Sequence, residues 1–421
     1  MSRVAAEKPR ILLLAPAFWP PVGAEALTGY KFWRGATEQG WQIDVIARDS
    51  RGEGRYPVLF ADNSPEFRGR VFQVKPDDHF FLKLRDNLAG LAGSKIWRRG
   101  WSWVYPACRL ASELIIKNRY DAVVSRSLPL DGHIAGLWLK KKSGLPWIAN
   151  WNDPAPLYLM PSPYRENYGV DPAWGDGHTL KQISIHADWH TFPCERLRKF
   201  IASYLPVDIL SKSSVIPHVA LSDWMLSLQQ HDGLRFFYAG DIRPPRSAET
   251  FLEGLSKFLR KTPMAAQNIE VSFAGQGADE VFNRAREIGL DCVRSLGLLD
   301  YQKVNEFAVQ SDVGLLIEAD MEEGIFLPSK MIDLVQCGLP VLAIVPKTGT
   351  ISDLIQKYGG GLAVDVARPD DIAAAIERIW LMWKEGALSQ KLSSRSMLPE
   401  FCEDTIFSRL EGVLERLEER V

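Results

Sequence analysis

The sequence predicts an α/β protein with parallel β-sheets, and two observations support this prediction. Short apolar runs recur along the 421-residue chain and alternate with segments of helix length. Such runs are typical of strands that helices cover on both faces of a parallel sheet. In addition, residues 10–29 and residues 234–255 follow one plan: an apolar strand, a Pro/Gly loop and then a helical pattern. The repeated plan predicts two Rossmann-like domains in tandem.

The predicted strands form two series, each beginning with one of the repeated segments. The strand at Arg10 is followed by 42–47, 121–125 and 146–150, and the strand at Leu234 by 269–274, 291–296, 312–317 and 340–345. A shift from apolar to polar sequence within 216–233 marks the expected domain boundary. We therefore expect an N-terminal domain over 1–218, a C-terminal domain over 219–385 and a helical segment over 386–421. Residues 404–420 carry a single apolar stripe and are expected to form a helix that crosses back onto the first domain.

Composition narrows the class of protein. A length of 421 residues suits two domains, and 46% apolar with 24% charged residues is ordinary for a soluble globular protein. The net charge of −2 argues against a nucleic-acid partner, which requires a basic surface. The five cysteines are scattered without a C-x-x-C pair, which favours reduced thiols in a cytoplasmic setting and no zinc site.

The N-terminal apolar run, residues 11–15, is compatible with a signal peptide or with a first strand. Pro16 and two further prolines interrupt the run, so a first strand is the better interpretation. Nowhere do 18 apolar residues follow one another, so no membrane-spanning helix is expected.

The segment 311–350 carries the strongest functional signal. Its pattern predicts a buried strand, a polar loop, a helix over 328–337 that begins at Pro-Ser-Lys, and a second buried strand. The N-terminal end of a helix binds phosphate-sized anions, because its first N–H groups have no partner within the helix. Lys330 would add a positive charge at that end.

The apolar positions of this helix leave Ser329, Lys330 and Asp333 on or near its other side. Asp333 is then available to bind hydroxyl groups. It is also explained by compensation of the helix dipole in the first turn. That second explanation does not account for Lys330 or for the glycine-containing acidic loop before the helix.

Two glycine-containing turns follow predicted strands in the same domain. Gly240 precedes Arg243 and Arg246, and glycine permits a close approach to a ligand whose phosphate oxygens arginine binds. Gly275 and Gly277 form a second turn of this type. Taken alone, these features are also compatible with solvated arginines and an ordinary strand-to-helix turn.

Taken together, residues 236–380 resemble the donor-binding domain of the GT-B glycosyltransferases, in particular the retaining enzymes of family 4. The resemblance is carried by YAGDIR, VSFAGQG, SDVGLLI, PSKMIDLVQCGLPVLA and GGGLAVDVARPDD. APAFWPPVGAEAL is similar to the loop on the acceptor side of that family. The resemblance implies two Rossmann-like domains facing a cleft. It also implies transfer of a sugar from a nucleotide diphosphate to a hydroxyl, with retention and without cofactor or metal.

The resemblance also implies roles for single residues. Arg243 and Lys330 fall where catalytic basic residues grip the diphosphate, and Arg246 assists them. Asp333 falls where a glutamate commonly holds the donor ribose, and Gly23 and Ala24 fall where backbone amides approach the diphosphate.

The glutamate that touches the transferred sugar in the family has no direct counterpart, because Ile325 stands at the expected spacing. Glu322 or Glu323 would have to replace it.

On the acceptor side, Asp153 matches an acidic position facing the cleft, and Arg126 stands where the family often carries a histidine. Asp153 is also explained as a cap of its own loop. Residues 150–178, rich in proline and aromatic residues, are expected to form a long loop. Its rings would either stack on sugar faces or merely pin the loop to the surface.

Residues 80–103 mix basic residues with Phe and Trp, which suits either a membrane interface or a helix packed on its own domain. The expected partners are thus a nucleotide sugar, a glycan or lipid-linked acceptor and the inner membrane face. Two other functions stay open. A non-catalytic nucleotide-sugar-binding scaffold is favoured by the missing glutamate and by Asp333. An epimerase is disfavoured because no histidine follows His231.

Overall fold

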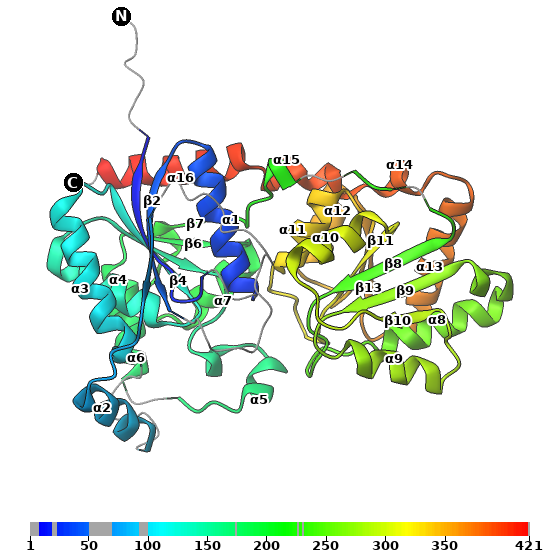
Figure 1. Cartoon of the computed structure of the whole chain (residues 1–421), viewed down its shortest axis with the longest axis horizontal. Helices are drawn as coiled ribbons and strands as arrows, with labels where there is room; N and C mark the ends of the chain where they lie inside the picture. Colours follow the sequence, from blue (N-terminus) through cyan, green and yellow to red (C-terminus); the bar gives the residue numbers. More distant parts are fainter. Residues whose placement is uncertain are drawn as a thin grey trace, which may run out of the picture.

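The computed structural model of the protein describes residues 8–18, 23–49, 70–91, 100–172, 175–224, 227–229 and 231–419. These residues form two parallel β-sheets that lie side by side, each with helices packed against it (Figure 1). The predicted class, α/β with two Rossmann-like domains, is confirmed.

The N-terminal sheet has the strand order β3-β2-β1-β4-β5-β6-β7. Its strands are β1 (Arg10–Leu14), β2 (Gln42–Arg48), β3 (Arg70–Val74), β4 (Ala122–Ser127), β5 (Trp147–Trp151), β6 (Trp189–Phe192) and β7 (Ser213–Val215). Its helices are α1 (Ala24–Glu38), α2 (Phe80–Leu91), α3 (Trp101–Lys117), α4 (Asp131–Ser143), α5 (Tyr164–Tyr168), α6 (Asp176–His186) and α7 (Glu195–Tyr204). The sequence did not predict β3, β6 and β7.

The C-terminal sheet has the order β10-β9-β8-β11-β12-β13. Its strands are β8 (Leu234–Ala239), β9 (Ile269–Ala274), β10 (Val293–Ser295), β11 (Val313–Ile317), β12 (Val341–Val345) and β13 (Gly361–Asp365). The helices are α8 (Glu249–Lys261), α9 (Ala278–Glu287), α10 (Tyr301–Val309), α11 (Ser329–Cys337), α12 (Thr350–Tyr358) and α13 (Pro369–Lys384). Here β8, β9, β11 and β12 match predicted strands within two residues, whereas β10 is shorter than predicted and β13 was not predicted.

The chain passes between the domains twice, and the two crossings lie together. The Ala220 amide donates to the Phe401 carbonyl oxygen at 2.8 Å, which joins the first crossing to the second. The second crossing includes α14 (Leu388–Leu392) and α15 (Leu398–Phe401) and leads into α16 (Glu403–Glu418). Ile406, Phe407 and Leu410 of α16 are buried in one core with residues of β1 and β2. The terminal helix therefore packs on the N-terminal domain (Figure 1).

The segment 150–178 is more ordered than the long loop that its composition indicated. Its described part contains a 3₁₀ turn at Leu157–Leu159, the helix α5 and the start of α6. Met160 and Tyr164 are buried against Ala319 and Met321 of the C-terminal domain. The segment thus packs against both domains. Among the described helices, none is both long and apolar enough to cross a membrane.

Candidate active site in the interdomain cleft

Helix α11 brings a lysine to the carboxyl-end side of the C-terminal sheet. The helix begins at Ser329, directly after Pro328, and no side chain caps its first turn. The Lys330 ammonium donates to the Tyr238 hydroxyl at 2.7 Å and lies 4.4 Å from the centre of that ring. Burial lowers the pKa of Lys330 to about 7, and the positive charge of Arg246 acts in the same direction. A phosphate placed here would restore the charge.

The glycine turns pack against this lysine. Gly240 has a φ of 140°, and a Cβ there would lie 2.9 Å from the Lys330 ammonium. A Cβ at Gly275 would collide with the Gly240 carbonyl oxygen, and one at Gly277 with the carbonyl oxygen of Ile242. The two turns are therefore stacked on each other beside Lys330, and only glycine permits that approach.

The structure distinguishes the two arginines of this turn. Arg243 is exposed, with 55% of its side chain accessible, and its guanidinium pairs with Asp241 at 2.8 Å. Arg246 is 28% exposed and pairs with the buried Glu318 at 3.3 Å. Burial disfavours the charged form of Arg246, but Glu318 outweighs this effect and raises the pKa of Arg246 above its ordinary value. Arg246 is therefore the inner cation next to Lys330, and Arg243 lies at the rim.

Glu318 is a buried carboxylate that the sequence reasoning missed. It follows β11 directly and is 4% exposed. Its Oε2 accepts from the Tyr164 hydroxyl at 3.1 Å and from the Arg246 guanidinium at 3.3 Å. Its Oε1 is buried and has no hydrogen-bond partner among the described residues. The available signal was an acidic residue at the carboxyl end of an otherwise apolar strand.

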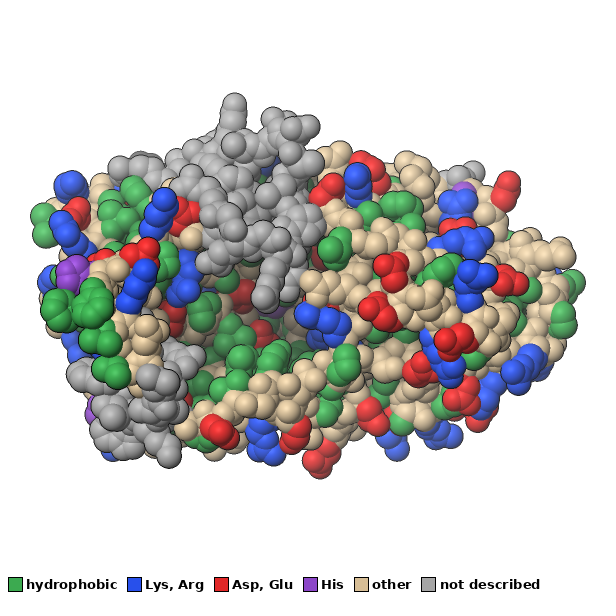
Figure 2. Space-filling view, turned by 60° about the horizontal axis from the view of Figure 1, so that its bottom comes forward, with side chains coloured by type: hydrophobic (Ala, Val, Ile, Leu, Met, Phe, Trp, Pro, Cys, Tyr) green, Lys and Arg blue, Asp and Glu red, His purple; other side chains and the backbone are tan. Residues whose placement is uncertain are grey.

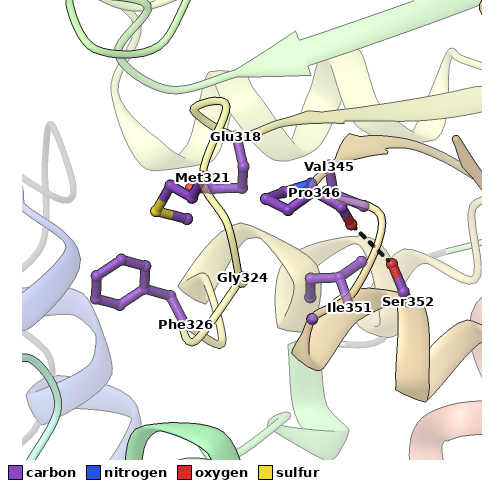
Figure 3. A pocket seen from close by; sticks show the side chains of 9 residues that line it. Glu318, Met321, Gly324, Phe326, Val345, Pro346, Ile351 and Ser352 are labelled. Atoms are coloured by element: carbon purple, nitrogen blue, oxygen red, sulfur yellow. Dashed lines mark hydrogen bonds between the residues drawn. The ribbon is translucent and has the colours of Figure 1, made fainter. Parts of the chain in front are cut away.

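Glu318 lines a small pocket together with Met321, Gly324 and Phe326, and Pro346 and Ile351 stand on the opposite side (Figure 3). Glu322 and Glu323, the two glutamates considered for the sugar contact, do not line this pocket. Glu323 pairs with Arg196 of the N-terminal domain, and Glu322 is exposed.

Asp333 lies one turn into α11 and accepts hydrogen bonds from one residue of each domain. Its Oδ1 accepts from the Lys31 ammonium at 2.5 Å and from the Tyr301 hydroxyl at 2.6 Å. Lys31 belongs to α1, so this pair connects the helices on the two sides of the cleft.

The N-terminal end of α1 faces the same cleft. Gly23 and Ala24 are exposed, and no side chain caps the helix. Glu25 accepts from Arg126 Nε at 2.9 Å and from Asn152 Nδ2 at 2.7 Å. Arg126 is 4% exposed and also donates to Thr28 at 2.8 Å. Arg126 therefore holds Glu25 in place and does not present its guanidinium to the open cleft.

The carboxylates of Asp153, Glu25 and Glu318 lie near one another, the first two in the N-terminal domain and the third in the C-terminal domain. Burial raises the pKa of Asp153 to about 7, and the negative charges of Glu25 and Glu318 add to this effect. Burial also raises the pKa of Glu25 to about 7, although Arg126 and Asn152 oppose it. The described residues contain no group of three His, Cys, Asp or Glu side chains that would hold a metal ion. This acidic wall is suited to accept hydrogen bonds from hydroxyl groups.

His133, a histidine of α4, belongs to the core. It is 0% exposed, lies 2.8 Å from the Ser125 hydroxyl, and burial lowers its pKa to about 3. Its ring is therefore neutral at physiological pH.

The chain is similar to known proteins in part of its sequence and in its overall fold. Residues 233–381 match the family Glycosyl transferases group 1. No curated protein sequence matches the chain significantly. Sucrose-phosphate synthase from Thermosynechococcus elongatus aligns over 98% of this chain and 100% of its own, with a TM-score of 0.68 and 14% identity.

Two further structures show the same likeness. A glycosyltransferase from Rickettsia africae aligns over 98% of this chain and 100% of its own, with a TM-score of 0.64 and 12% identity. The Anabaena protein HepE, solved with UDP and glucose, aligns over 96% of this chain and 99% of its own, with a TM-score of 0.63 and 13% identity. At such identities the likeness establishes the fold alone. The chain therefore has the GT-B fold of these glycosyltransferases, and residues 233–381 of its C-terminal domain match the glycosyl transferases of group 1.

Proposed function

We propose that the enzyme transfers a sugar from a nucleotide-diphosphate donor to a hydroxyl of a glycan, a polysaccharide or a lipid-linked precursor, with retention of configuration. One observation carries the proposal: Lys330 and Arg246 lie together beside the uncapped start of α11, next to the buried Glu318. Such a group of cations and backbone N–H donors matches a diphosphate. HepE, which shares the fold, was solved in complex with UDP-glucose.

The diphosphate is held by Lys330, Arg246 and the N–H groups of Ser329 and its neighbours. Gly240, Gly275 and Gly277 let the backbone approach it, and Gly23 and Ala24 offer amides from the opposite domain. Arg243 contributes long-range charge from the rim. When the bond to the sugar breaks, negative charge grows on the leaving phosphate oxygen, where these donors stabilise it. The reaction proceeds without a cofactor, because the nucleotide sugar already carries the leaving group.

Glu318 binds the transferred sugar. A buried carboxylate oxygen without a partner is costly, and a sugar hydroxyl next to the diphosphate would supply the missing hydrogen bond. Arg246 and Tyr164 fix the other oxygen, so the free one is pre-oriented. This assignment gives Glu318 the role for which the sequence offered only Glu322 or Glu323.

The acceptor lies against the N-terminal domain. Asp153 and Glu25 accept hydrogen bonds from its hydroxyls, and Arg126 positions Glu25. Because the two domains contribute opposite walls, their approach excludes water and brings the acceptor hydroxyl to the anomeric carbon. Without a protein nucleophile, retention requires the acceptor hydroxyl to attack from the side that the diphosphate leaves.

We also propose that the enzyme works at the cytoplasmic face of a membrane, through α2. Phe80 and Phe81 are 68% and 69% exposed, and Leu84 and Leu88 are 40% and 50% exposed. Basic residues lie among them, including Lys83 with 54% of its side chain accessible. Figure 2 shows hydrophobic and basic side chains together at the end of the molecule that holds α2. Exposed aromatic residues on a helix that also carries basic residues fit a bilayer surface.

A thermal-shift screen with UDP-, GDP-, ADP- and dTDP-linked sugars tests the donor site. A ligand at 100 times its Kd adds about 2.7 kcal/mol to the unfolding free energy. The shift should vanish in Lys330→Ala and Arg246→Ala, with turnover lowered on the order of 10²–10³-fold. Arg243→Ala, a matched change in the same turn, should retain most of the shift. A folded protein that responds to none of these sugars would contradict the donor site, whereas binding without turnover would favour the scaffold hypothesis.

A further inference from the structure

Lys31 carries a positive charge into the interface between the domains. It lies on α1, is 2% exposed, and its ammonium bonds to two side chains of α11. These are Asp333, at 2.5 Å, and Gln336, at 2.8 Å. The rings of Trp224 and Tyr301 lie 5.6 and 5.7 Å from the ammonium and complete its surroundings. A buried ammonium is costly unless it is paired, so Lys31 depends on the carboxylate of Asp333.

This contact ties together the parts of the cleft that the proposed donor site uses. Helix α1 begins at Ala24 and helix α11 at Ser329, and neither beginning has a side-chain cap. Gln336 also accepts from the backbone amide of Leu221, at 3.1 Å, in the segment that crosses between the domains. The crossing segment and both helices are therefore joined at one buried point.

The pairing leaves half of the Asp333 carboxylate available. Lys31 and Tyr301 both bond to Oδ1, and no bond to Oδ2 is present among the described residues. The Asp333 side chain retains 18% of its accessibility. A carboxylate that is pinned by one oxygen and open at the other has a fixed direction, which favours recognition of a hydroxyl group.

We infer that Lys31 is a positioning residue for the nucleotide: it fixes the Asp333 carboxylate and joins α1 to α11. The inference rests on the proposed donor site. It also explains why position 333 carries aspartate, whose shorter side chain keeps the carboxylate within reach of Lys31 and Tyr301. The nucleotide site then belongs to both domains, although Lys31 itself does not contact the nucleotide.

The test is a double-mutant cycle with nucleotide affinity as its readout. Titration calorimetry with UDP-, GDP-, ADP- and dTDP-glucose gives the Kd of wild type, Lys31→Met, Asp333→Asn and the double variant. Each single change should raise the Kd roughly 5–150-fold, the range of typical coupling between sites. The double variant should bind about as weakly as the weaker single variant, because Lys31 acts through Asp333.

Arg34→Met is the matched control. Arg34 lies on the same helix, and its guanidinium pairs with Asp223 of the first crossing and with Glu38. This change should leave the Kd unaltered. If Lys31→Met does not fold, Lys31→Gln keeps a donor of similar length and removes only the charge.

The outcomes separate the inference from the donor site. If wild type binds and Lys31→Met lowers Tm but changes Kd less than about twofold, Lys31 is purely structural and the inference is wrong. Independent, additive effects of the two changes would overturn it as well. If wild type binds none of the four nucleotide sugars, the proposed donor site fails, and the inference fails with it.

Discussion

The pKa of Lys330 leads to a prediction about how nucleotide binding depends on pH. Burial lowers this pKa from 10.5 to about 7, so the free enzyme loses the ammonium charge as the pH rises through neutrality. A diphosphate beside Lys330 favours the charged form and raises the pKa again. Binding above pH 7 must therefore take up a proton, and affinity must fall as the pH rises.

The size of the effect follows from the fraction of enzyme that carries the ammonium. With a pKa of about 7, that fraction falls from roughly 0.76 at pH 6.5 to roughly 0.03 at pH 8.5. The apparent Kd is inversely proportional to this fraction, so it should rise about 25-fold, or ~1.9 kcal/mol. The folding stability of the free protein depends on pH in the opposite direction to nucleotide affinity. Its unfolded chain binds more protons between pH 7 and 10.5, so Lys330 makes the folded state more stable as the pH rises through that window.

Calorimetry with UDP-glucose in buffers of different ionisation enthalpy measures both Kd and proton uptake. At pH 8 we expect uptake of about 0.9 proton per site. Lys330→Arg is the control, because arginine stays charged throughout this range. Any slope that remains in this variant reports Glu25 and Asp153, whose pKa values of about 7 place their ionisation in the same interval. A Kd that is constant between pH 6.5 and 8.5, with no proton uptake in wild type, would refute the reasoning.

Two further predictions concern the sugar contact and the membrane surface. Glu318→Gln should lower kcat/KM roughly 10–150-fold, the value of a charged hydrogen bond, while leaving the Kd of free UDP nearly unchanged. Tyr164→Phe should have a smaller effect in the same assay, and an equal loss of UDP affinity in Glu318→Gln would contradict the assignment. In sedimentation with vesicles rich in phosphatidylglycerol, the double change Phe80→Ser and Phe81→Ser should abolish binding. Ile116→Ser, at an 85% exposed position of α3, should not.

The sequence predicted the fold well because the decisive signals are local. The repeated strand–loop–helix plan and the apolar runs identified β1, β2, β4 and β5 and four strands of the second sheet. Two of the missed strands lack that signal: β7 has three residues and none is fully buried, and β6 contains polar His190 and Thr191. Their pairing with neighbouring strands comes from the sheet and not from their own composition.

The site was only partly predictable. The start of α11 at Ser329, and with it the position of Lys330, follow from a motif within one helix turn. Which arginine faces inward does not, since Arg243 and Arg246 belong to the same short turn and differ only in what surrounds them. Arg246 turns inward because it pairs with the buried carboxylate of Glu318, which lies 72 residues further along the chain. Local sequence contains no information on that partner.

The pair of Lys31 and Asp333 shows the same limit more clearly, because 302 residues separate its members. In the sequence, Lys31 is one basic residue on an amphipathic helix, and Asp333 matches a ribose-binding position with a shortened side chain. Only the packed domains show that each residue explains the other: the buried ammonium requires a carboxylate, and a carboxylate shared with Lys31 must stay close to its own helix. Residues that depart from a family pattern are therefore informative about contacts between domains. In this enzyme Asp333, the residue that favoured a non-catalytic scaffold on the sequence, joins helix α11 to helix α1 of the N-terminal domain.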